Sequence, residues 1–498
     1  MNTQNITDLD PKRVFYYFNE IASIPHGSRN TKAISDYLIG FADTHGLKFR
    51  QDDMGNVIIW KNGKGKTPVI LQGHMDMVCE KEPDCDKDME KEGLDLYIDA
   101  DELKAKGTTL GGDDGIAVAM TLAILEDDDP DIPPIEAIFT VDEEIGMLGA
   151  AAIDVSDIDG RTMINIDSEA EGVLTVSCAG GVVANAIMDI VREEHEKRAG
   201  LSIYDIRVDG LIGGHSGIEI HKNRANAIVL LGRLLQRLRD EEGIRIIDID
   251  GGAKDNAIAV SAHVRILLSV NADAAIQRIT EEYMSDIRSE FSTTDPGISI
   301  ISKKMNEDDI PDNIVSLDER STDHLIYMLC CLPNGIQRMS PDVEGLVQTS
   351  LNMGILKITG NAEDKDERVI LTFCVRSSVA SEKDALKRRL KDGMSVIGGI
   401  VEFEGEYPGW QYLKDSKLRE LIREVYISQY KKEPVIEAVH AGVECGFFAD
   451  KLPELDCVSI GPDLSEIHTF RESMNILSVG RTYDLVREVL RRIAVGDK

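Results

Sequence analysis

The chain has 498 residues, 42% of them hydrophobic and 29% charged, which is more apolar material than one hydrophobic core holds, so two domains are expected. Its formal net charge of −34 repels phosphate backbones and anionic lipids, which argues against a nucleic-acid or membrane-surface partner. The first ten residues lack the pattern of a signal peptide and no apolar run could span a bilayer, so a cytoplasmic location is expected.

The first part of the chain has the pattern of an α/β fold. Apolar residues at Val14, Phe18 and Ile21 follow Asp10-Pro11 at helical spacing and predict an opening helix. Three short, continuously apolar runs predict buried strands, and the apolar stretch between the first two predicts a buried helix. The strand runs are 69–71, 135–141 and 163–166, and the helix is 116–125. This order predicts a mostly parallel sheet flanked by helices.

The pattern changes near residue 187 and returns near residue 399. Between these positions, alternating strands mix with long amphipathic helices, one of which is marked by apolar repeats at 227–238. Beyond them, apolar runs at 435–436 and 457–460 again predict strands next to helices. The predicted domains are therefore a discontinuous α/β domain, 1–186 and 399–498, and an inserted α+β domain, 187–398.

Acidic and histidine side chains follow the predicted strands where the strands end. Ligands bind at the carboxyl edge of such sheets, so we expect these side chains to lie close together. Each position alone is more often a helix N-cap or an incidental His-x-Asp, but the joint set offers imidazole and carboxylate and no thiolate. Such a set suits a divalent metal such as zinc. Its members are His74, Asp76, Asp113, Glu143, Glu144, Asp167 and His468.

Two spacings indicate a division of roles within this set. In an extended stretch residues two apart point the same way, so the Asp76 carboxylate can accept the second ring N–H of His74. Adjacent Glu143 and Glu144 leave a loop in different directions, so one can bind metal while the other takes and returns a proton of the attacking water. These residues leave open whether Asp113 or its neighbour contacts the metal.

Six motifs between residues 74 and 468 carry a resemblance to a known family. They are His74-Met-Asp-Met-Val-Cys-Glu-Lys81, Lys106-Gly-Thr-Thr-Leu-Gly-Gly-Asp-Asp-Gly115, Thr140-Val-Asp-Glu-Glu-Ile-Gly146, Gly213-Gly-His-Ser-Gly217, Ala441-Gly-Val-Glu-Cys-Gly446 and Ser459-Ile-Gly-Pro462. Together they resemble the co-catalytic zinc metallopeptidases, and among these the aminoacyl-histidine (Xaa-His) dipeptidases. Carnosinases, tripeptidase T, carboxypeptidase G and aminoacylases belong to the same family. The stretch His468-Thr-Phe-Arg471-Glu472 departs from the family's His-Ser-Pro pattern, so the resemblance does not extend to the shape of the specificity pocket.

The resemblance implies a zinc aminopeptidase-like catalytic domain with two divalent metal ions, zinc first and manganese or cobalt as alternatives. Asp76 would orient His74, and Glu143 would be the general base and then the general acid. The implied ligands are His74, Asp113 and Asp167 for one metal, with Asp113 bridging to a second metal held by Glu144 and His468.

The inserted domain would be the family's lid. His215 would stabilise the oxyanion, although a glycine-rich turn with an incidental histidine explains it equally well. Asn256 and Arg376 would hold the terminal carboxylate of the substrate, and Glu444 would bind its free amine. A turn asparagine, an exposed strand arginine and a helix-start glutamate are the alternative interpretations of these three residues.

The expected activity is metal-dependent hydrolysis of dipeptides, with Xaa-His dipeptides as substrates. A related amide hydrolase, such as a tripeptidase or an N-acyl amino acid deacylase, is the first alternative. A catalytically inactive peptide-binding relative is the second, and the intact Glu143 beside five ligands argues against it. The expected partner is a small peptide, and a homodimer is a candidate assembly.

Overall fold

The computed structural model describes residues 5–196, 200–360 and 366–496, and the chain divides into two compact units. The predicted domain boundaries at 187 and 399 fall inside the second unit. The physical reason is that β9 (Gly180–Asp189) and β19 (Ile400–Tyr407) pair with each other in the sheet of that unit, which no local pattern reveals. The first unit consists of Met1–Cys178, Gly409–Ala438 and Val443–Lys498, and the second of Ala179–Pro408 and Val439–Gly442.

The main sheet of the first unit has a parallel centre. β3 pairs in parallel with both β6 and β7, and β7 pairs in parallel with β21, whereas β1 and β2 add antiparallel strands at one edge. The predicted strands all occur here, and the α/β fold is confirmed. In spatial order the strands are β1 (Lys48–Gln51), β2 (Val57–Lys61), β6 (Ile135–Thr140), β3 (Val69–His74), β7 (Thr162–Asn165), β21 (Asp456–Ser459), β8 (Val173–Cys178) and β20 (Val435–Val439).

Alternate residues of the central strands enter two hydrophobic cores. On β3, Val69 and Leu71 pack in the core formed with α1, α3 and α11, whereas Ile70 packs in the core formed with α4 and α10. Every residue of β3 and β6 is buried, as expected for strands covered on both faces. The helices of this unit are α1 (Lys12–Ala22), α2 (Lys32–Thr44), α3 (Gly112–Glu126), α4 (Leu148–Ala152), α9 (Lys417–Tyr430), α10 (Cys445–Lys451) and α11 (Ile476–Gly496).

A small antiparallel sheet joins two distant parts of the first unit. It contains β4 and β5 from the first hundred or so residues and a short hairpin, β22 and β23, from near the end of the chain. Its strands are β22 (Leu464–Ser465), β23 (Ser473–Asn475), β5 (Glu102–Ala105) and β4 (Leu96–Asp99). His468 lies in the loop that connects the two strands of this hairpin.

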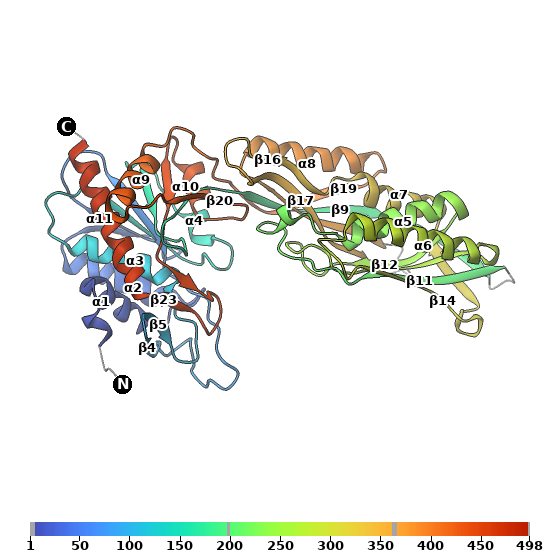
Figure 1. Cartoon of the computed structure of the whole chain (residues 1–498), viewed down its shortest axis with the longest axis horizontal. Helices are drawn as coiled ribbons and strands as arrows, with labels where there is room; N and C mark the ends of the chain where they lie inside the picture. Colours follow the sequence, from blue (N-terminus) through green and yellow to red (C-terminus); the bar gives the residue numbers. More distant parts are fainter. Residues whose placement is uncertain (1–4, 197–199, 361–365, 497–498) are drawn as a thin grey trace. The chain divides into compact units, whose positions relative to one another are not determined.

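The second unit is an antiparallel sheet whose helices share one core with it, which is an α+β arrangement (Figure 1). The predicted helix at 227–238 is α5, which begins where the Asn226 side chain accepts the N–H groups of Ile228 and Val229 and ends at Gly243, with φ of 66°. The sheet strands are β14 (Ser299–Lys304), β11 (Leu201–Asp209), β13 (Ala262–Ser269), β12 (Arg245–Gly251), β17 (Val347–Thr359), β18 (Arg368–Ser377), β9 and β19, with β16 (Gly335–Met339) beside β17. The helices are α5 (Ala227–Glu242), α6 (Asp273–Glu290), α7 (Glu319–Cys331) and α8 (Ala380–Ser395). Within the described ranges of both units, no helix combines the length and apolar character that crossing a membrane requires.

Candidate active site

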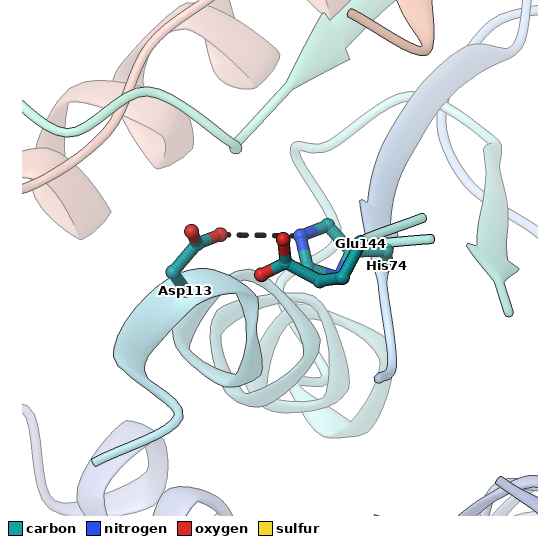
Figure 2. Close-up of side chains that lie close together, drawn as sticks. All are labelled: His74, Asp113 and Glu144. Carbon is teal, nitrogen blue, oxygen red and sulfur yellow. Dashed lines mark hydrogen bonds and ion pairs between the residues drawn. The ribbon is translucent and has the colours of Figure 1, made fainter. Parts of the chain in front are cut away.

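Five segments of the first unit bring the predicted metal ligands together near the carboxyl end of the parallel strands. His74 ends β3, Asp113 begins α3, and Figure 2 shows their side chains meeting beside Glu144, which follows β6. The His74 Nε2 atom lies 3.1 Å from Asp113 Oδ1 and 3.6 Å from Asp167 Oδ1, the latter in the loop after β7. Residues from distant parts of the chain therefore converge on one small volume, as the sequence predicted.

Asp113 occupies the centre of this cluster. Its Oδ1 atom faces His74, while its Oδ2 atom lies 3.1 Å from His468 Nε2. His468 Nε2 in turn lies 3.0 Å from Glu144 Oε1. One carboxylate thus presents a separate oxygen to each of two imidazoles, which is the arrangement expected of a group shared by two metal ions.

The neighbouring Asp114 has a different environment. Its side chain is 1% exposed and accepts the backbone N–H of His74, at 3.2 Å. Burial, together with the charge of Asp167, raises the pKa of Asp114 well above the usual value for a carboxyl group. Ligand atoms of Asp114, His74 and Asp167 also lie close enough together to hold a metal ion. Asp113, however, is the aspartate whose carboxylate also contacts His468.

The hydrogen bonds of the cluster indicate whether a cation could bind between its side chains. The Nδ1 atom of His74 lies 2.9 Å from the backbone oxygen of Asp76, which can only accept, so Nδ1 carries the proton. If Nε2 carries no proton, its lone pair faces the carboxylates of Asp113 and Asp167, so either a second ring proton or a bound cation is needed between these groups. Glu144 Oε1 is also buried without a hydrogen bond, although it faces His468. The donor set fits divalent metals.

The acids also alter the proton affinity of the histidines. Burial opposes protonation of His74, but hydrogen bonding to Asp113 and Asp167 holds the pKa of His74 well above its ordinary value. The hydrogen bond to Asp113 and the nearby Glu144 carboxylate raise the pKa of His468 to about 10. Both shifts express the same excess of negative charge that a bound cation would neutralise.

Asp76 contacts its neighbours differently from the prediction. The second ring N–H of His74 donates to the backbone oxygen of Asp76, and the Asp76 carboxylate stands 3.5 Å from that nitrogen. The carboxylate instead accepts the N–H of Glu143 at 3.0 Å, the N–H of Glu144 at 3.4 Å and the Ser28 hydroxyl at 2.8 Å. The sequence spacing places Asp76 beside His74 but does not decide whether its backbone oxygen or its carboxylate faces the ring.

Glu143 lies beside this cluster in the loop after β6. Its environment is dominated by burial, which raises the pKa of the Glu143 carboxyl well above its usual range, with Asp167 and Glu444 adding to the effect. A carboxyl group with increased proton affinity is better suited to accept and later return a proton.

Glu444 lies at the start of a helix, as one interpretation of the sequence expected, and it is fully buried within the first unit. It is the residue before α10, but its Oε2 atom accepts from Gln72 Nε2 and Thr140 Oγ1, both at 2.6 Å. Its Oε1 atom is buried and has no hydrogen-bond partner in the part of the chain that the structure describes. Burial raises the pKa of Glu444 to about 7. Sequence reasoning missed the polar network below it, in which Asn165 donates to Gln72. No local spacing connects these residues.

The predicted lid residues belong to the second unit. The backbone N–H groups of Gly217 and Ile218 both donate to His215 Nδ1, each at 3.1 Å. A nitrogen that accepts hydrogen bonds carries no proton, so the proton of the neutral ring is on Nε2. Burial, with the nearby Arg376 guanidinium, lowers the pKa of His215 and keeps this ring neutral. His215 is therefore a hydrogen-bond donor through Nε2.

Arg376 borders the same turn as His215. A Cβ atom placed on Gly217 would lie 3.0 Å from His215 Cε1 and 3.1 Å from Arg376 Nε, so the two side chains meet at this glycine. Arg376 is 6% exposed, its Nη1 atom donates to Tyr407, and its Nε atom is buried without a partner. The interpretation as an exposed strand arginine is wrong. Asn256 is exposed, and its backbone oxygen accepts the Ser216 N–H at 2.8 Å.

Comparison with known proteins identifies the family. Residues 206–295 match the model of the peptidase dimerisation domain, M20_dimer. The chain is 34% identical over 492 residues to the cytosol non-specific dipeptidase of Escherichia coli (strain K12), covering 98% of this chain and 99% of the relative. The chain belongs to the M20 family of metallopeptidases.

Solved structures agree with this assignment. The aminoacylhistidine dipeptidase of Vibrio alginolyticus is 33% identical, with 98% of each chain covered and a TM-score of 0.92. The aminopeptidase PepT of Bacillus cereus is 17% identical, with 98% of this chain and 99% of that chain covered and a TM-score of 0.55, and it shows the same fold. The predicted resemblance to the metallopeptidases of the dipeptidase class is confirmed.

Proposed function

We propose that this chain is a cytoplasmic dipeptidase that uses two divalent metal ions, with zinc as the first candidate and manganese or cobalt as alternatives. The observation that carries the proposal is the position of Asp113, whose two oxygens face His74 and His468 separately at 3.1 Å. The full-length similarity to the cytosol non-specific dipeptidase supports both the activity and the location.

The proposal assigns the ligands as two sets that share one residue. His74, Asp113 and Asp167 would hold one metal, and Asp113, Glu144 and His468 the other. Bound divalent metals would polarise the scissile carbonyl and lower the pKa of the attacking water to about 7.

The other residues act directly on the substrate and its protons. Glu143 takes a proton from the attacking water and returns it to the leaving amine, in keeping with its raised pKa. His215 donates its Nε2 proton to the developing oxyanion. The terminal carboxylate binds to Arg376 and Asn256, and the buried, unpartnered Oε1 of Glu444 attracts the free amine.

The substrate range is proposed to include Xaa-His dipeptides without being confined to them. The Escherichia coli relative is described as non-specific, and the Vibrio alginolyticus protein as an aminoacylhistidine dipeptidase. The deciding experiment is hydrolysis of a dipeptide panel beside the tripeptides and N-acetylated analogues. Preference for N-acetylated substrates would favour the deacylase alternative, and hydrolysis of none would favour a peptide-binding relative.

A homodimer is proposed from the match of residues 206–295 to the peptidase dimerisation domain. Sedimentation equilibrium of the purified protein should give twice the mass of one chain. A monomer mass across the concentration range would rule this assembly out.

Metal content offers the first quantitative test. After removal of metals with a chelator, activity should be lost, and dialysis against zinc should restore it together with two metal ions per chain, because Asp113 can serve both sets. Metal analysis and dipeptide hydrolysis on the same samples check this. A stoichiometry that stays at one under saturating zinc would contradict the shared role of Asp113.

A further inference from the structure

The Glu472 side chain fills the turn that carries Asp113. Its Oε2 atom accepts the backbone N–H groups of Leu110 at 2.7 Å and Gly111 at 3.0 Å. Its Oε1 atom accepts those of Gly112 at 2.8 Å and Asp113 at 3.3 Å. Glu472 is 3% exposed, so a single buried carboxylate holds four successive N–H groups.

This contact lies at the start of α3, where backbone N–H groups have no partner within the helix and attract negative charge. Gly111 has φ of 66°, in the left-handed region that favours glycine. A Cβ atom on Gly112 would lie 3.2 Å from Glu472 Oε1 and 3.1 Å from Leu464 Cδ2, so a side chain there would push on the carboxylate by a few tenths of an ångström. The turn is shaped around the carboxylate.

Glu472 and His468 belong to the same loop, between β22 and β23. The pairing of Leu464 with Met474 and of Ser465 with Ser473 closes this loop at its base. The backbone N–H of Glu472 also donates to the Thr469 oxygen at 3.1 Å. A rigid connection therefore runs from the loop of His468, through the Glu472 carboxylate, to the backbone N–H of Asp113.

We propose that Glu472 is a positioning residue that sets the Asp113 carboxylate against His468 and thereby sets the affinity for the metal they share. The inference rests on the proposed function, because it takes Asp113 and His468 as metal ligands. Both oxygens of the Glu472 carboxylate accept backbone N–H groups of the turn, so Glu472 would act on the metal through Asp113. Residues that orient metal ligands in this way typically contribute 10–100-fold to metal affinity.

The test uses the full-length protein and the substitution Glu472→Gln, which keeps the shape but replaces one accepting oxygen by an NH₂ group that faces backbone N–H donors. Zinc titration of the metal-free protein should show binding weakened by about 10–100-fold. At saturating zinc, kcat should recover toward the wild-type value with KM unchanged. A zinc affinity equal to that of the wild type would contradict the positioning role.

A matched control is Glu136→Gln in the same unit. Glu136 is also 3% exposed and accepts backbone N–H groups, from Asp159 at 3.1 Å and Gly160 at 2.8 Å, but it lies at the opposite end of β6 from Glu143. We expect this variant to lose thermal stability while binding zinc as the wild type does. Equal loss of zinc affinity in both variants would mean that general destabilisation is responsible, and would overturn the proposal.

Gly112→Ala alters the same contact between Glu472 and the turn, this time from the side of the turn. It replaces Glu472→Gln in the test if that variant does not fold. The added methyl should displace the carboxylate and weaken zinc binding as well. If the wild type binds a metal pair and neither variant changes its affinity, the positioning role is wrong while the proposed function stands. If the wild type binds no metal pair, the proposed function itself fails and the role of Glu472 fails with it.

Discussion

Glu143→Gln should lower kcat by about 10²–10⁴-fold while the protein retains both metal ions. The amide has nearly the same shape as the carboxylate but cannot accept a proton from the attacking water. Glu144, the proposed ligand, is unchanged in this variant, and the N–H of residue 143 still donates to Asp76, which holds the loop in place. The loss should therefore be confined to the chemical step.

The comparison variant is Glu144→Gln, which alters the adjacent residue by the same chemistry. Because Glu144 Oε1 faces His468 at 3.0 Å, this substitution should lower metal content together with activity. Metal analysis and steady-state kinetics on both variants separate the two roles. Wild-type turnover by Glu143→Gln, or loss of metal from it, would show that the base has been assigned to the wrong residue.

His215→Ala should lower kcat by about 10²–10³-fold, equivalent to about 2.7–4 kcal/mol of transition-state stabilisation, with metal content unchanged. The expectation follows from the ring's hydrogen bonds, since Gly217 and Ile218 donate to Nδ1 and leave the proton on Nε2. The lowered pKa keeps the ring in this neutral state. A donor that acts only on the developing oxyanion contributes to kcat and little to KM.

His221→Ala provides the control for this variant. His221 lies six residues further along the same segment and is exposed, so its removal should leave kcat and KM as they are. Steady-state kinetics over a range of dipeptide concentrations distinguishes the outcomes. If His215→Ala raised KM and kept kcat, His215 would bind the ground state of the substrate and the oxyanion role would have to be given up.

Much of the catalytic unit was predictable because its signals are local. Strands buried on both faces appear as continuous apolar runs, as at 69–71, and several of the proposed ligands lie at or just after the ends of such strands. His74, Asp113 and Glu144 could therefore be named as one cluster before any coordinates, since the carboxyl ends of parallel strands must lie at one edge of the sheet. The family resemblance then supplied roles that spacing alone left open, above all the choice of Asp113.

The predictions were weakest for contacts that depend on the orientation of the backbone and for boundaries that depend on pairing between distant strands. The sequence could place Asp76 two residues from His74, but only the tertiary structure shows that the backbone oxygen, and not the carboxylate, accepts the ring N–H. The domain boundary was misplaced because β9 finds its partner β19 more than two hundred residues away, and strand pairing leaves no local pattern.

The sequence by itself determined the fold class, the family and the set of side chains at the strand ends, because these depend on periodicity and on short motifs. Only the tertiary structure decided that Asp113 faces two histidines at once and that Asp114 turns into the core. Likewise, Glu472 lies 361 residues from Gly111, and only the tertiary structure shows that its carboxylate accepts the Gly111 N–H. Contacts between distant segments are set by how the whole chain packs, so they cannot be deduced from either segment alone.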